Sequence, residues 1–147
     1  MPCILLTGAT GYIASHTWLA LQEAGFDVVG IDSLVNSSVK VLDRIETIGR
    51  RAPHFVQGDV RDAAALDRCF ELARTRFGGI QAVVHFAALK AVGESVERPL
   101  DYFENNLGGL LSVCQAMKRH GVNNLVFSSS ATVYGSPDTL PITEDAP

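Results

Sequence analysis

Two glycines, Gly8 and Gly11, follow a short apolar run near the amino terminus and precede a longer amphipathic segment. Glycines at this spacing let a backbone turn tightly and approach a pyrophosphate closely. A helix that begins near Tyr12 would add unpaired N–H groups and the positive end of its dipole. Ala14 takes the place of the third glycine of such loops, where the helix packs closest to the sheet. Because glycines are common in turns, the pattern by itself is a weak indication of a phosphate-binding loop.

An acidic residue, Asp32, ends the second apolar run, at about the 20-residue offset expected of an acid that binds an adenosine ribose. A carboxylate there repels a 2′-phosphate, which favours NAD over NADP as the ligand. The alternative is that Asp32 is an ordinary strand-end residue. A second acid, Asp59, follows the third apolar run and is placed to face the adenine. It could instead cap the next helix, although Asp62 lies closer to that helix start.

Two later segments carry groups that could meet the same ligand. In Phe86–Lys90, the small residues would let a dinucleotide pass near the backbone. Lys90 could reach an anionic or hydroxyl-rich ligand, or it could be a solvated charge. The adjacent Asn105 and Asn106 are unusual inside a long predicted helix, because Asn is a poor helix former. A cofactor or partner contact would explain them better than helix propensity does.

The stretch Phe127–Gly135 reads FSSSATVYG, a run of hydroxyls that follows what we predict to be a buried strand, Leu125–Phe127. In a nucleotide-binding α/β fold, such a strand end is where a substrate hydroxyl meets a cofactor. It could equally be an ordinary strand exit, in which Ser and Thr satisfy backbone groups. We interpret His85 and Trp18 as core residues rather than as a catalytic base and a stacking surface.

Short apolar runs alternate with amphipathic segments along the chain, which predicts strands and helices in alternation. The runs are mostly unbroken, as in strands that helices cover on both faces. The first helix is expected to bury a face made of Ile13, Thr17, Leu21 and Ala24. The predicted strands are Cys3–Leu6, Val28–Ile31, His54–Val56, Ala82–Phe86 and Leu125–Phe127, and the predicted helices are Tyr12–Ala24, Val39–Ile48, Ala63–Phe77 and Leu100–His120.

This alternation indicates an α/β fold of Rossmann type, a doubly wound parallel sheet of about five strands with helices on both faces. The chain of 147 residues fits one domain, spanning residues 1–147, and we expect the sheet to be truncated at its carboxyl-terminal side. The formal charge of −4 argues against a nucleic-acid partner, which needs concentrated Lys and Arg. No apolar run approaches the roughly 18 residues of a membrane-spanning helix.

The three cysteines, Cys3, Cys69 and Cys114, are widely spaced. They form no Cys-x-x-Cys pair, and no Cys/His cluster has the spacing of a zinc site. We predict that they are buried reduced thiols of a cytoplasmic protein, with no bound metal.

Five segments of the chain together resemble one known family. The chain resembles the N-terminal part of the UDP-glucose 4-epimerases, which are extended short-chain dehydrogenases/reductases within the NAD-dependent epimerase/dehydratase family. The block at His85–Asn106 discriminates best, because related sugar-nucleotide dehydratases share the glycine loop and the serine strand but differ there. The matching segments are TGATGYIASHT at Thr7–Thr17, DSLVNSS at Asp32–Ser38, GDVRD at Gly58–Asp62, HFAALKAVGESVERPLDYFENN at His85–Asn106 and FSSSATVYG at Phe127–Gly135.

The resemblance implies a role for each matching residue. Ser130 would hydrogen-bond the reacting sugar hydroxyl, while the cofactor NAD would be held by residues from several loops. These are Gly8, Gly11, Tyr12 and Ile13 at the pyrophosphate, Asp32, Asn36 and Ser37 at the adenosine ribose, Asp59 and Val60 near the adenine, and Phe86, Ala87, Lys90 and Asn105 along the rest of the cofactor.

The resemblance also implies an activity, the interconversion of UDP-glucose and UDP-galactose by removal and return of a hydride at carbon 4 of the hexose. In the family, a tyrosine of a Tyr-x-x-x-Lys pair removes the hydroxyl proton. Its pKa must fall from the free value of about 10, and the lysine and the positive cofactor ring lower it. The residues four positions after this chain's three tyrosines are His16, Asn106 and Asp138, so none is a lysine.

We therefore expect this chain to be an inactive N-terminal piece of such an isomerase, without the region that grips the UDP-hexose. The family forms homodimers through helices that include Leu100–His120, and the partner helix would follow the missing tyrosine. For that reason we do not expect this piece to dimerise alone. Two alternatives remain open, a non-catalytic NAD-binding module and a related NAD-dependent sugar-nucleotide epimerase or dehydratase.

Overall fold

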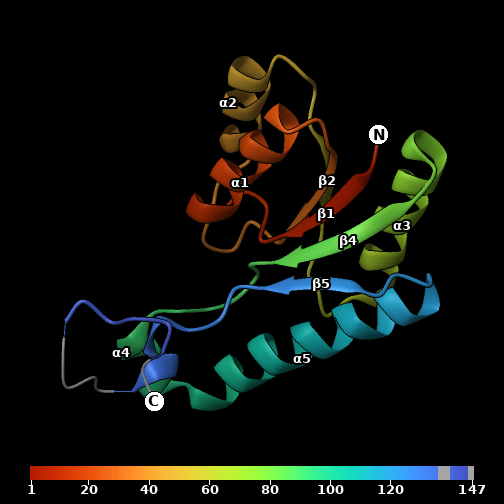
Figure 1. Ribbon diagram of the computed structural model, residues 1–147. Helices are drawn as coiled ribbons and strands as arrows, with labels where there is room; N and C mark the ends of the chain where they lie inside the picture. The colour runs from red at the N-terminus through yellow and green to blue at the C-terminus, as the bar shows by residue number, and fades with distance from the viewer. Residues whose placement is uncertain (136–139, 146–147) are drawn as a thin grey trace.

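The computed structural model describes residues 1–135 and 140–145. It contains a five-stranded parallel sheet in the order β3-β2-β1-β4-β5, with helices on both faces (Figure 1). The strands are β1 (Cys3–Thr7), β2 (Asp27–Asp32), β3 (His54–Gln57), β4 (Ile80–His85) and β5 (Asn124–Phe127). The helices are α1 (Tyr12–Glu23), α2 (Lys40–Gly49), α3 (Ala63–Phe77), α4 (Val92–Glu97) and α5 (Pro99–Arg119), and a short 3-10 helix covers Ala131–Tyr134.

The strand order reverses between β1 and β4, because the chain first builds outward to β3 and then returns to the other side of β1. In open α/β sheets, ligands bind beyond the carboxyl ends of the strands at such a switch point. The α/β fold and the predicted strands and helices are thereby confirmed, with ends that differ by at most two residues. The exception is α4, a six-residue helix that was not predicted and has no buried residue.

Two apolar layers cover the sheet, and β1 contributes alternately to both. Cys3 and Leu5 pack in the layer under α3 and α5, whereas Ile4 and Leu6 pack in the layer under α1 and α2. Alternation with period two is a property of any strand, and here both faces are buried, so the strand reads as an unbroken apolar run.

The buried face of α1 differs from the predicted one. Ala14 and Trp18 are its buried residues, while Ile13 is 53% exposed and the Thr17 hydroxyl donates to the Ile13 carbonyl. The physical reason is the large Trp18 ring, which fills the space above Gly30 in β2 and sets the rotation of the helix. The interpretation of Trp18 as a packing residue is confirmed by its complete burial.

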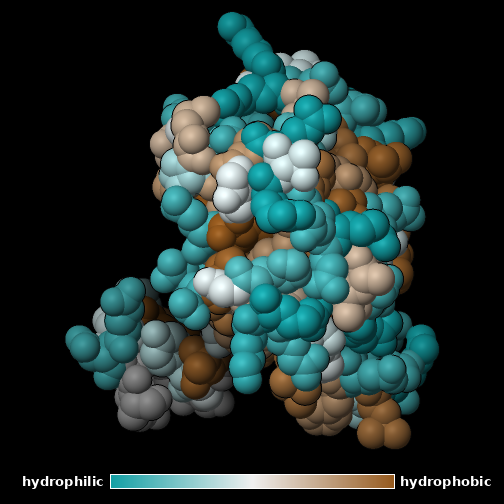
Figure 2. All heavy atoms as spheres, turned by 90° about the vertical axis from the view of Figure 1, so that its right-hand side faces the viewer, coloured by the Kyte–Doolittle hydropathy of each residue, from teal (hydrophilic) through white to brown (hydrophobic). Residues whose placement is uncertain are grey.

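The prediction that Leu125–Phe127 forms a buried strand is wrong for the described chain. The strand lies at the edge of the sheet and pairs only with β4, and Val126 and Phe127 are 59% and 51% exposed. A second apolar surface runs along one face of α5, at the lower end of the molecule, where Figure 2 shows apolar side chains gathered. Its members are spaced three or four residues apart and are Leu100, Phe103, Leu107 and Leu111.

The cysteines divide into two groups. Cys3 and Cys69 are free and buried, and burial raises the pKa of each thiol to about 12, which makes them inert packing residues. Cys114 is exposed on α5, so the prediction of burial is wrong for this residue. It occupies a helix position that points away from the sheet, one residue after the buried Val113.

Two glycines, Gly30 in β2 and Gly108 in α5, differ in how closely other side chains surround them. A Cβ added at Gly30 would overlap the Trp18 ring and lie 2.7 Å from the Ala9 Cβ, whereas a Cβ added at Gly108 in α5 meets nothing within 4 Å. We predict that Gly30→Ala lowers the free energy of unfolding by about 1–3 kcal/mol through overpacking. Gly108→Ala should raise it by about 0.5–1 kcal/mol, because Ala is the better helix former. Urea unfolding of both variants measures this, and equal effects would contradict the packing described here.

Candidate functional site

The loop between β1 and α1 passes directly beside the loop that follows β4. Gly8 has a φ of +63°, and a Cβ there would lie 2.9 Å from the Ala87 nitrogen. The Gly11 N–H donates to the Gly8 carbonyl at 2.9 Å and closes the turn. Any side chain at position 8 would therefore push the two loops apart.

The first turn of α1 opens onto this turn without a side-chain cap. Gly11 is the N-cap residue and has no side chain to accept from the first N–H groups of the helix. Tyr12 is 81% exposed and Ile13 is more than half exposed, so neither side chain shields the helix start from a ligand. Ala14 is buried, and its methyl group is accommodated against the sheet. The geometry is that of an anion-binding helix start with a glycine turn.

The Asp32 carboxylate joins two loops. One oxygen accepts from the Thr10 N–H at 3.1 Å, and the other accepts from the Leu34 N–H at 2.8 Å and the Ser37 hydroxyl at 3.1 Å. The Thr10 and Ser37 hydroxyls also bond each other at 2.7 Å. Asp32 is only 8% exposed, and it holds the β1–α1 and β2–α2 loops together. It is thus more than an ordinary strand-end residue, while Asn36 in the same loop is exposed.

Asp59 and Val60 lie at the end of the next loop. Asp59 accepts from the Arg61 N–H at 2.8 Å and from the Arg61 guanidinium at 2.6 Å. Hydrogen bonds from this guanidinium hold the pKa of the Asp59 carboxyl below its usual value. The cap of α3 is Asp62, whose side chain accepts from the Ala64 N–H at 2.9 Å. Val60 is buried against α5.

Sequence reasoning missed a hydrogen-bond node between β1 and β4. The Thr7 hydroxyl oxygen accepts from the N–H groups of Phe86 and Ala87, both at 3.2 Å, and lies 2.7 Å from His85 Nδ1. Since the oxygen already accepts twice, its proton points to Nδ1, which requires a neutral imidazole protonated on Nε2. Both side chains are buried, and burial lowers the pKa of His85.

A signal for this node existed in the sequence. Thr7 and His85 are polar residues at the carboxyl ends of two apolar runs, and the register pairs them across β1 and β4. The interpretation of His85 as a core residue is confirmed, with the addition that its neutral form joins two strands.

The loop after β4 is held from the other side by α5. Asn106 bonds both backbone groups of Leu89, and Asn105 donates to the Asn106 side chain. Lys90, the residue after Leu89, is exposed. We expected the Asn105-Asn106 pair to contact a cofactor or a partner. Asn106 instead makes its contact with Leu89 of the same chain.

Ser130 is exposed and lies three residues beyond the carboxyl end of β5. Its carbonyl accepts from the Val133 N–H at 3.2 Å, so it begins the short 3-10 helix. The preceding Ser128 donates its N–H to the His85 carbonyl at 3.2 Å, which continues the β4–β5 pairing into this segment.

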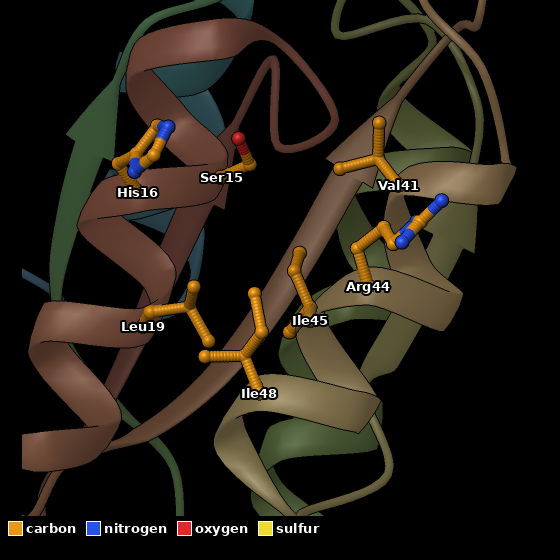
Figure 3. A pocket seen from close by; sticks show the side chains of 7 residues that line it. All are labelled: Ser15, His16, Leu19, Val41, Arg44, Ile45 and Ile48. Carbon is orange, nitrogen blue, oxygen red and sulfur yellow. The ribbon is translucent and has the colours of Figure 1, made fainter.

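A groove elsewhere on the surface does not belong to this site. It lies between α1 and α2, where Leu19, Ile45 and Ile48 point toward one another below Ser15, Val41 and Arg44 (Figure 3). It is lined mainly by apolar side chains, and it is a gap in the packing between these two outer helices. Within residues 1–135 and 140–145, no group of three His, Cys, Asp or Glu side chains could hold a metal ion. The same residues include no helix long and apolar enough to cross a membrane.

Comparisons with a protein family, with individual sequences and with solved structures agree with one another. The family described as NAD dependent epimerase/dehydratase matches residues 4–147. UDP-glucose 4-epimerase of Bacillus subtilis (strain 168) is 49% identical over 144 residues, which cover 98% of this chain and 41% of that protein. UDP-glucose 4-epimerase of Neisseria meningitidis serogroup B is 50% identical over 147 residues, covering 100% of this chain and 42% of that protein.

Solved structures are similar over the same span. UDP-glucose-4-epimerase from Stenotrophomonas maltophila, with bound NAD and formylated UDP-arabinopyranose, has a TM-score of 0.89 at 48% identity. UDP-glucose 4-epimerase from Bifidobacterium longum, in complex with NAD+ and UDP, has a TM-score of 0.89 at 46% identity. Each comparison covers 99% of this chain and 42% of the other. The chain thus spans about two fifths of the length of these relatives.

The neutral His85 predicts a loss of stability in mild acid. Its pKa is lowered in the folded chain, so its contribution is complete above the unfolded value of 6.5 and is lost as the pH falls from there through the folded value. The free energy of unfolding should fall by at most about 1.4 kcal/mol per pH unit from this group. Urea unfolding between pH 7.5 and pH 5 measures the slope.

His85→Asn is the matched variant, because an amide oxygen can still accept from Thr7 but does not titrate. Its slope below pH 6.5 should be shallower than that of the wild type. Identical slopes would show that His85 does not titrate with folding.

Proposed function

The chain belongs to the NAD dependent epimerase/dehydratase family, and we propose that it forms the NAD-binding part of a UDP-glucose 4-epimerase. The observation that carries this proposal is the convergence of three loops beside Gly8. The backbones of Gly8 and Ala87 are in contact, the start of α1 is uncapped, and the Asp32 carboxylate lies at the next strand end. A dinucleotide needs these three features in one place.

The residues present fit NAD. The backbone around Gly8, Gly11, Tyr12 and Ile13 offers close approach and N–H groups to the pyrophosphate. When bound, NAD supplies the nicotinamide ring that accepts a hydride from carbon 4 of the sugar and returns it. The other residues proposed to hold it are Asp32, Asn36 and Ser37 at the ribose, Asp59 and Val60 near the adenine, and Phe86, Ala87, Lys90 and Asn105 along the remaining length.

Ser130 is proposed to hydrogen-bond the reacting hydroxyl of a UDP-hexose. Its exposure just beyond the carboxyl end of β5 supports this role. Removal of the hydroxyl proton also needs a base, and none of Tyr12, Tyr102 and Tyr134 is followed by a lysine four residues later. We therefore propose that these 147 residues bind the cofactor but do not turn over substrate alone.

Two further properties of the whole protein are proposed. The exposed apolar surface of α5, described above, supports a homodimer of the whole protein whose interface includes this helix. The free buried thiols of Cys3 and Cys69 support a reducing compartment, the cytoplasm.

The charge of Asp32 should set the preference between NAD and NADP. Asp32→Asn keeps the size and shape of the side chain and one accepting oxygen, but it removes the charge that repels a 2′-phosphate. We predict that the ratio of the two dissociation constants shifts toward NADP by about tenfold, a difference of about 1.4 kcal/mol. Isothermal titration calorimetry with each cofactor measures the ratio.

The control is Asp27→Asn, which makes the same charge change at the other end of β2. It should leave the ratio unchanged. An unchanged ratio in Asp32→Asn would remove this carboxylate from the ribose site.

A chimera tests the proposed reaction. Residues 1–147 of this chain would be followed by the remainder of the Bacillus subtilis relative. We predict that the chimera interconverts UDP-glucose and UDP-galactose, measured by a coupled assay of product. Ser130→Ala in the chimera should lower kcat by about 10²-fold, the cost of losing one positioned hydrogen-bond group.

Ser129→Ala, in the adjacent position, is the matched control and should retain most of the activity. A folded chimera that binds NAD but converts neither sugar nucleotide would contradict the proposed reaction.

A further inference from the structure

The segment from Phe86 to Ala91 crosses the proposed site between β4 and α4 without regular structure. Such a segment has few bonds of its own to fix its path. Two side chains from α5 supply that order, and they act on residues on either side of Lys90.

The first anchor is Asn106. Its side-chain oxygen accepts from the Leu89 N–H at 2.8 Å, and its nitrogen donates to the Leu89 carbonyl at 2.9 Å. One amide thus bonds both polar groups of one residue, which fixes the orientation of the peptide planes on both sides of Leu89. Asn is a poor helix former, and these two bonds offset its cost inside α5.

The second anchor is Tyr102, which is almost fully buried. Its hydroxyl oxygen accepts from the Ala91 N–H at 3.2 Å, and its O–H donates to the Glu94 carboxylate at 2.8 Å. Lys90 therefore lies between two anchored residues, with an exposed side chain on a constrained backbone.

Asn106 also orients its neighbour on the helix. Its oxygen accepts a second bond, from the Asn105 side-chain nitrogen at 2.9 Å. Since the bonds to Leu89 settle which atom of Asn106 is oxygen, they also settle that Asn105 directs its nitrogen toward Asn106. The side-chain oxygen of Asn105 makes none of these bonds and is the group that another partner would contact.

We propose that Asn106 is a positioning residue for the dinucleotide, which holds Lys90 and Asn105 in the arrangement that binds it. This inference rests on the proposed function. Asn106 itself makes its bonds to the chain, so its effect on ligand affinity passes through Lys90 and Asn105. A purely structural tie between α5 and the loop would instead change stability without coupling to Lys90.

The first test needs no ligand. Asn106→Ala should speed hydrogen exchange of the Leu89 amide by about tenfold, because the amide loses its acceptor. Gln115→Ala is the matched control, since Gln115 is an exposed amide on the same helix and both changes raise helix propensity. Unchanged exchange at Leu89 in Asn106→Ala would overturn the proposal.

The second test measures NAD binding by calorimetry in a double-mutant cycle. Asn106→Ala should weaken binding about tenfold if the binding-competent arrangement falls to roughly a tenth of its population. In a Lys90→Ala background the same change should cost about threefold or less, because part of its effect passes through Lys90. Gln115→Ala should leave binding unchanged.

Asn106→Asp keeps the oxygen that accepts from Leu89 and Asn105 but cannot donate to the Leu89 carbonyl when ionised. Its affinity should lie between those of the wild type and Asn106→Ala, and this variant serves if Asn106→Ala does not fold. Equal losses in both Lys90 backgrounds, or wild-type affinity in Asn106→Ala, would overturn this proposal alone. Absence of NAD binding by the wild-type chain would overturn the proposed function and this inference with it.

Discussion

The close approach of two backbones beside Gly8 is the constraint on which the rest of the site depends. Ala87 comes so near that position 8 has no room for a Cβ, and the Thr7 hydroxyl holds this contact by accepting from Phe86 and Ala87. The same hydroxyl needs an acceptor for its proton, which the neutral ring of His85 provides. A buried polar group without a partner would be costly. Thr7 and His85 therefore stabilise the contact between the two backbones only when both are present.

The other loops are tied to this junction by side chains. Asp32 bonds the backbone of Thr10 and the hydroxyl of Ser37, which brings the β2–α2 loop against the glycine turn. On the opposite side, α5 holds the segment after β4 through Asn106 and Tyr102. Loops ordered before a ligand arrives lose less conformational freedom when it binds. The loops of the site are therefore held in place by these bonds, while some of their side chains are exposed, including those of Tyr12 and Lys90.

Local pattern was sufficient to predict the framework but not the contacts within it. Gly8, Gly11 and Asp32 stand out in the sequence because a glycine turn and a strand-end acid have a characteristic spacing along the chain. The roles of Thr7 and Asn106 depend on which strands are neighbours and on the register between them, and spacing does not contain that information. The buried face of α1 was misjudged because one large ring, Trp18, decided the rotation of the helix. The exposure of β5 follows from its place at the sheet edge, which apolar composition does not reveal.

We propose that the dinucleotide binds across the carboxyl ends of β1, β2 and β4. Backbone amide chemical shifts of the chain, recorded by NMR during titration with NAD, test it most directly. The largest shifts should fall on residues 8–13, 32–37 and 86–90, and the groove between α1 and α2 should be unaffected. Shifts confined to that groove, or no shifts at saturating NAD, would contradict it.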